Sequence, residues 1–247
     1  YKTWLMVVFV SGLSFAGYFA VKYLGSKIGI AFSGLLGGIA SSTAVTTSMS
    51  QRSKEVKEKE HRPFVIATIL ACSVMFIRVI FVSATLNGEV SLLLLLPIAS
   101  MFIAGILPLA ILWGDNGSKK GEDLELSSPF RIKPAISFAL IFTFVQFAVQ
   151  ILINNDFGNS GIILTSILAG ITDVDAITLS LSGFAREGII SSDIAFSGII
   201  TAVLTNTVVK GGIAWFWGGK EYRKRVAIIL LIVELIGILS LFLVKGF

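Results

Sequence analysis

Three stretches of this chain contain no charged residue and are each long enough to cross a lipid bilayer. They are residues 3–21, 90–113 and 135–153. Three more apolar stretches, at 63–83, 194–217 and 226–244, contain one internal charge each. About 20 consecutive apolar residues suffice for a helix to span the hydrocarbon core. The sequence therefore predicts an all-α, polytopic integral membrane protein.

Composition points to the same class of protein. The chain is 55% hydrophobic and 14% charged, whereas soluble domains contain about 25% charged residues. The net charge of +5 comes from basic residues in loops, which set topology, so it does not indicate nucleic-acid binding. The only histidine, His61, lies in a charged loop and is expected to be solvated, and the only cysteine is Cys72. With no Cys/His cluster and no Ser/His/Asp set, we expect no enzyme and no cofactor other than a bound cation.

One polar motif occurs twice in the chain. Residues 38–50 and 170–182 align without a gap at an offset of 132 residues, and the same offset pairs Arg78 with Lys210. We therefore predict two related repeats, at residues 1–114 and 134–247, joined by a polar linker at 115–133.

Each predicted repeat contains four hydrophobic segments, of which the second carries the motif. The first repeat has segments at 3–23, 27–50, 63–85 and 90–113. The second repeat has segments at 134–153, 159–185, 193–217 and 225–245.

Two topologies are open, depending on whether the motif segments cross the membrane. If all eight segments cross, the repeats are parallel, and the loops on the two sides carry 12 and 6 basic residues. If each motif segment is a broken or re-entrant helix, each repeat has three spans and the repeats are inverted. The split is then 15 to 3, which fits the positive-inside rule better. Inverted repeats are common in transporters, so we favour this second topology.

The motifs have the pattern of helices that break inside a membrane. Gly37-Gly38 and Ala169-Gly170 are predicted breaks, because glycine favours non-helical backbone. Strong N-cap residue types follow each break; they are Ser41, Ser42 and Thr43 in the first motif and Thr172, Asp173 and Asp175 in the second. Each break would expose backbone N–H groups and free carbonyls that can bind ions.

A polar stripe follows each predicted break. Thr43, Thr46 and Ser50 form the first stripe, and Asp175, Thr178 and Ser182 form the second. The spacing i, i+3, i+7 places each stripe on one face of a helix. Such a face can line a hydrophilic path, or it can hold packed helices together through small polar residues.

Asp173 and Asp175 are the most specific candidates for a site. Their equivalents in the first motif are Ser41 and Thr43, so the acidic pair belongs to one repeat alone. Two carboxylates near a bilayer midplane form a cation or proton site, with Ser41, Ser42, Thr43, Thr46 and Thr178 as neutral oxygen ligands. The alternative is that Asp173 is a plain N-cap and that Asp175 is neutralised by Lys210 or Arg78.

Three further charged residues lie inside predicted spans. Arg78 and Lys210 occupy equivalent places, and buried cations of this kind need partners. They either hold the repeats together through a salt bridge to Asp173 or Asp175, or occupy the cation site when substrate is absent. Asn206 lies four residues before Lys210 and shares its helical face. Glu234 could carry a proton or face the interior with a partner.

Several of these motifs resemble a known family. Gly34 to Thr46, Met75 to Arg78, Gly170 to Thr178 and Asn206 to Lys210 together resemble the domain of unknown function in the C-terminal half of MgtC/SapB-type prokaryotic membrane proteins. Such proteins are grouped with magnesium transporters largely through an MgtC-like N-terminal domain, which this chain does not contain. The resemblance implies a multi-pass protein of a prokaryotic inner membrane. Because the chain opens at Tyr1, we expect it to be a piece of a longer protein.

We therefore expect a transporter or channel-like protein for a small ion, with a cation as the first choice. Its site would lie at the two broken motif helices. Two alternatives remain: a transporter for a small anion or organic solute, held by half-helix N-termini and the Arg/Lys pair, or a non-transporting scaffold or regulator. Expected partners are the lipid bilayer, the transported solute, a further copy of the chain and an MgtC-like domain.

The inverted topology predicts that residues 51–62, 115–133 and 220–225 face the cytoplasm. Single cysteines in place of Glu55, Glu122 and Glu221 should resist a membrane-impermeant thiol reagent in intact cells. Ready labelling at position 55 or 122 would contradict this topology. Labelling at position 221 alone would favour eight full spans.

Overall fold

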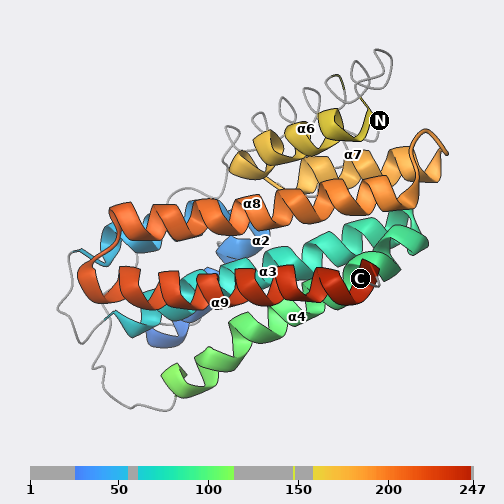
Figure 1. Ribbon diagram of the computed structural model, residues 1–247. Coiled ribbons are helices and arrows are strands. Elements are labelled where there is room, and N and C mark those ends of the chain that lie inside the picture. Colours follow the sequence, from blue (N-terminus) through green and yellow to red (C-terminus); the bar gives the residue numbers. More distant parts are fainter. Residues whose placement is uncertain (1–25, 55–60, 114–146, 148–157, 246–247) are drawn as a thin grey trace. The chain divides into compact units, whose positions relative to one another are not determined.

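The structure is a computed structural model that describes residues 26–54, 61–113, 147 and 158–245 (Figure 1). Every regular element in these ranges is an α-helix. They are α2 (Ser26–Arg52), α3 (Arg62–Leu86), α4 (Gly88–Trp113), α6 (Gly158–Thr172), α7 (Asp175–Arg186), α8 (Ser192–Trp217) and α9 (Lys220–Lys245). The predicted all-α class is therefore confirmed for the described part of the chain.

Four of these helices, α3, α4, α8 and α9, are long and apolar enough to cross a membrane. They coincide with the segments expected at 63–85, 90–113, 193–217 and 225–245. Leu92, Ile111 and Leu243 are among the many large apolar side chains that these helices leave exposed, as lipid-facing surfaces require. The segments expected at 3–23 and 134–153 and the linker at 115–133 fall on residues outside the described ranges, residue 147 excepted.

The chain forms two compact units, and each of the four apolar helices α3, α4, α8 and α9 is divided between them. The described part of unit 1 contains α2, α3 as far as Met75, α4 from Phe102, and Lys210–Val233. The described part of unit 2 contains Phe76–Met101, α6, α7, α8 as far as Val209, and α9 from Glu234. These units do not coincide with the two repeats, which remain a prediction from sequence.

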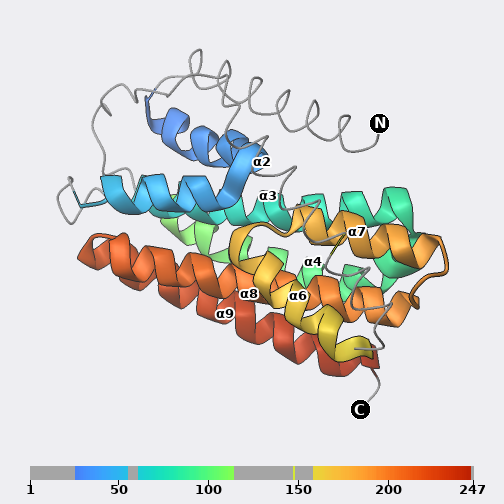
Figure 2. The same cartoon turned by 90° about the horizontal axis from the view of Figure 1, so that it is seen from above.

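Both motif segments are broken helices. In unit 1, α2 is interrupted at Ser41, whose backbone is extended, with φ −166° and ψ 105°. In unit 2, Asp173 and Val174 separate α6 from α7. In Figure 2 the second half of α2 runs back toward the side from which the first half came, and α7 does the same after α6. Ser41 and Asp173 are 132 residues apart, so the two breaks fall at equivalent places in the sequence.

The glycines predicted as breaks lie inside helical turns, so that prediction is wrong. Gly37 and Gly38 belong to the first half of α2, and Gly170 lies near the end of α6. A Cβ atom on Gly38 would lie 2.6 Å from the Ala71 Cα on α3, and one on Gly170 would lie 2.6 Å from the Ala202 carbonyl oxygen on α8. These glycines therefore permit close helix packing, and the capping residues that follow them make the breaks.

Gly170→Ala should lower the free energy of unfolding by about 1–3 kcal/mol, because the added methyl group overpacks the contact with α8. Gly212→Ala is the matched control, since a Cβ there would meet nothing within 4 Å. The control should be neutral or stabilising by up to about 1 kcal/mol, because alanine has a higher helix propensity than glycine. Unfolding in detergent measures both, and equal effects would contradict the close contact.

Candidate functional site

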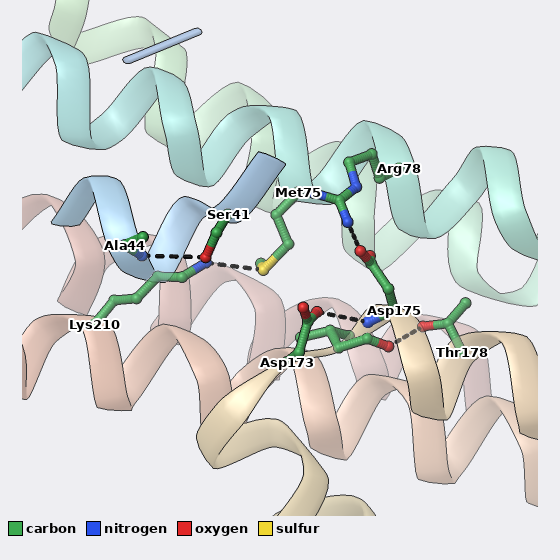
Figure 3. A network of polar contacts seen from close by, with 9 residues as sticks. Ser41, Ala44, Met75, Arg78, Asp173, Asp175, Thr178 and Lys210 are labelled. Atoms are coloured by element: carbon green, nitrogen blue, oxygen red, sulfur yellow. Dashed lines mark hydrogen bonds and ion pairs between the residues drawn. The ribbon is translucent and has the colours of Figure 1, made fainter. Parts of the chain in front are cut away.

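An ion pair between a buried carboxylate and a half-buried guanidinium lies at the start of α7 in unit 2. The Arg78 guanidinium, on α3, pairs with the carboxylate of Asp175, the first residue of α7, and their side chains are 17% and 10% exposed (Figure 3). A helix N-terminus attracts negative charge because its backbone N–H groups point outward. Asp175 is therefore stabilised as a carboxylate by both the helix end and the guanidinium. Of the two basic residues proposed to neutralise Asp175, the structure shows Arg78 in this role.

Asp173 lies one residue before the N-cap of α7, which is Val174, so the prediction of Asp173 as the N-cap is off by one residue, although its side chain still bonds a backbone N–H of the first turn. Its Oδ1 accepts a hydrogen bond from the Asp175 N–H at 2.9 Å, which satisfies one of the donors that the break leaves open. Its charge also attracts the Arg78 guanidinium. Both acidic residues of the second motif, Asp173 and Asp175, therefore attract the Arg78 guanidinium.

Two further predicted site residues stabilise the break from either side. The Asn206 side chain, buried on α8, donates from Nδ2 to the Gly170 carbonyl oxygen at 2.7 Å. This freed carbonyl was expected to be available to a cation, and here it accepts from an amide instead. The Thr178 hydroxyl donates to the Val174 carbonyl oxygen at 2.8 Å, which leaves its oxygen lone pairs able to accept.

In unit 1, the break in α2 is capped by a neutral residue. Ser41 Oγ accepts a hydrogen bond from the Ala44 N–H at 3.2 Å, which confirms Ser41 as the N-cap. Ser42 and Thr46 are buried, and the Thr46 hydroxyl donates to the Ser42 carbonyl oxygen at 2.8 Å. Thr43 is half-buried, and its carbonyl oxygen accepts from the Thr47 hydroxyl at 2.9 Å.

Lys210 lies in unit 1 and is fully buried, at 0% exposure. Its ammonium donates to the Met75 sulfur at 2.9 Å, and its charge acts on the buried thiol of Cys72. Cys72 and Met75 are three residues apart on α3 and so lie on the same helical face. Sequence reasoning assigned no contact to Met75, because a thioether is a weak acceptor that pattern analysis treats as core.

Tyr222 is a second residue that sequence reasoning missed. Its phenol is fully buried in unit 1, where its oxygen lies 2.8 Å from the Thr68 hydroxyl oxygen and 3.3 Å from that of Ser50. The predicted segment begins at residue 225 and so leaves Tyr222 out, although Tyr222, Val226 and Leu230 fall at the spacing of a buried helical face.

His61 is buried, so the prediction that it is solvated is wrong. A buried imidazole usually has hydrogen-bonding partners.

Glu234 lies in the unit 2 portion of α9, and its Oε2 is buried with no hydrogen-bond partner within the described ranges. Those ranges also contain no group of three or more His, Cys, Asp or Glu residues able to hold a metal ion. A metal at Asp173 and Asp175 would therefore depend on neutral oxygens for its remaining ligands.

The four helices that are long and apolar enough to cross a bilayer indicate a helical membrane protein. The chain belongs to the family described as Domain of unknown function (DUF4010), whose model matches residues 8–218. It is 35% identical over 209 residues to an uncharacterized protein of Aquifex aeolicus (strain VF5), which covers 82% of this chain and 88% of that protein. No solved structure matches the chain. The comparisons therefore show a domain of unknown function, and the affiliation with MgtC/SapB-type proteins stays an expectation.

Arg78→Met should lower the free energy of unfolding by about 3–5 kcal/mol, because it leaves the Asp175 carboxylate buried without its guanidinium. The double variant Arg78→Met/Asp175→Asn removes both charges and should recover much of this loss. Unfolding of purified protein in detergent tests the expectation. A double variant as unstable as the sum of the two single variants would show that the pair is not coupled.

Proposed function

We propose that this chain is a transporter or channel-like protein of a prokaryotic inner membrane, that it moves a small cation, and that the second motif supplies the cation-binding carboxylates. The observation that carries this proposal is the buried Arg78–Asp175 pair at the break between α6 and α7. Charged groups inside membranes are costly, and they commonly mark ion pathways.

In this proposal Asp175 has two alternative partners, the Arg78 guanidinium and the substrate cation. A carboxylate paired with a guanidinium becomes a ligand for a hard cation or a proton once that guanidinium moves away. In this proposal Arg78 is a built-in counter-ion that occupies the carboxylate when no substrate cation is present. The two positive charges compete for one site, so cation binding and release are linked to movement of the Arg78 side chain.

The hydroxyls of the motifs supply neutral ligands in this proposal. Thr46 and Thr178 each donate their proton to a backbone carbonyl. Their oxygens therefore keep lone pairs that can accept from water or contact a cation. Ser41, Ser42 and Thr43 are assigned the same neutral role, while Lys210, Asn206 and Glu234 balance charge or control access.

The proposed topology consists of two inverted repeats with re-entrant motif hairpins. The fold-back of α2 and of α6–α7 (Figure 2) supports hairpins, and the 15 to 3 distribution of basic residues supports inversion. Association with an MgtC-like domain or with a further copy of the chain belongs to the same proposal, and for these two partners the support is the sequence resemblance and the membrane setting.

One observation favours a second candidate, transport of a small anion or organic solute. Unit 1 contains both the buried ammonium of Lys210 and the half-helix N-terminus after Ser41, and both features attract negative charge. An anion transporter should depend on Lys210 and tolerate the loss of the Asp175 charge, which is opposite to the expectation for a cation transporter.

Asp175→Asn should abolish cation flux into liposomes while the protein remains folded, because the amide keeps the size of the side chain and removes the charge that binds the cation. Asp173→Asn should fold and keep partial flux, since asparagine caps a helix nearly as well as aspartate. Flux should be measured with a panel of monovalent and divalent cations.

Asp193→Asn is the matched control, because Asp193 is an exposed aspartate in the first turn of α8. It should leave flux unchanged. Full flux in Asp175→Asn would exclude the cation site, and loss of flux in Lys210→Met alone would then favour the anion transporter.

A further inference from the structure

The hydroxyl groups of α7 differ in how they are satisfied. Thr178 and Ser180 each donate to the carbonyl oxygen four residues earlier, both at 2.8 Å. Ser182 is also fully buried, at 0% exposure, yet its Oγ has no hydrogen-bond partner among the described residues. Ser182 is the last residue of the polar stripe formed with Asp175 and Thr178, and its hydroxyl does not make the usual hydrogen bond to a carbonyl oxygen of the preceding turn.

An unpaired buried hydroxyl is unfavourable, because it has lost its hydrogen bonds to water without gaining protein partners. Ser182 lies seven residues after Asp175 and four after Thr178. At 3.6 residues per turn these three side chains share one face of α7, whereas Ser180 points to a different side. The unpaired hydroxyl thus belongs to the same face as the carboxylate that pairs with Arg78.

The equivalent hydroxyl in unit 1 is satisfied by the protein. Ser50 lies 132 residues before Ser182, and it donates to the Thr46 carbonyl oxygen at 2.6 Å and lies 3.3 Å from the Tyr222 phenol oxygen. The residue 132 positions before Tyr222 is Val90, which offers no polar group. The last hydroxyl of the first stripe, that of Ser50, therefore has the Tyr222 phenol beside it. At the place in the sequence that corresponds to Tyr222 the first repeat has Val90, which cannot form such a contact.

We infer that the face of α7 formed by Asp175, Thr178 and Ser182 lines the path by which a hydrated cation reaches Asp175, and that the path is closed in this conformation. When the path opens, water that accompanies the ion pairs with the Ser182 hydroxyl, so the cost of the unpaired group falls on the closed state alone. The identity of the solute rests on the proposed function, whereas the opening of the path to water does not.

Cysteine accessibility tests the path. Ser182→Cys, reconstituted in liposomes, should react with a small, positively charged methanethiosulfonate reagent, and Ser180→Cys should not. These two positions are on the same helix and are equally buried, so they differ in the face they occupy. The wild-type chain, whose only cysteine is the buried Cys72, gives the background. A reaction at position 182 no faster than at position 180 overturns the inference.

Removal of the hydroxyl gives a second measurement that does not depend on a reactive cysteine. Ser182→Ala removes a group that is unpaired only in the closed state, so it should raise the melting temperature and lower flux about fivefold or more. Ser180→Ala should leave flux unchanged. A raised melting temperature with unchanged flux overturns the inference, because the hydroxyl would then be a packing defect with no part in opening.

The two proposals fail separately. If Ser182→Cys reacts while Asp175→Asn keeps full cation flux, the cation site is wrong and the path still stands, as the route of a different solute. If Asp175→Asn loses flux while Ser182→Cys stays unreactive, the cation site stands and its access lies elsewhere.

Discussion

A helix that breaks inside an apolar protein must find new partners for the backbone groups that the break releases. Within a bilayer water cannot supply them, so they must come from the protein. Here the side chains of Ser41 and Asp173 take up N–H groups at the two breaks, and Asn206 takes up a carbonyl oxygen of α6. These three contacts allow two broken helices to exist in a chain whose other described helices are continuous.

The break in the second motif also explains where the charge lies. A helix N-terminus favours a carboxylate, and Asp175 occupies this place with Arg78 beside it. The pair fixes α3 against α7 within unit 2, so any event that releases Asp175 also loosens this helix contact. The first motif breaks at the equivalent place in the sequence with the hydroxyl of Ser41 in place of a carboxylate, so a break of this kind does not require a charged residue.

Sequence reasoning found what depends on local pattern. The four spans follow from apolar length, and the capping role of Ser41 follows from residue type. It placed the breaks at the glycines because conformational freedom is a property of one residue, whereas the close approach to Ala71 and Ala202 is a property of two helices. It predicted that Lys210 pairs with Asp173 or Asp175, with Arg78 as the alternative partner of Asp175. The structure shows Arg78 as the partner of Asp175, and that choice depends on which helices pack together. Met75 and Tyr222 were missed for the same reason.

The capping geometry has an evolutionary consequence. An N-cap accepts serine, asparagine or aspartate almost equally, so the side chain at the break can gain or lose a charge over time without loss of the fold. Position 175 has less freedom, because a change there leaves the half-buried guanidinium of Arg78 without its carboxylate. Across related sequences, drift should therefore be independent at positions 41 and 173, and correlated at positions 78 and 175.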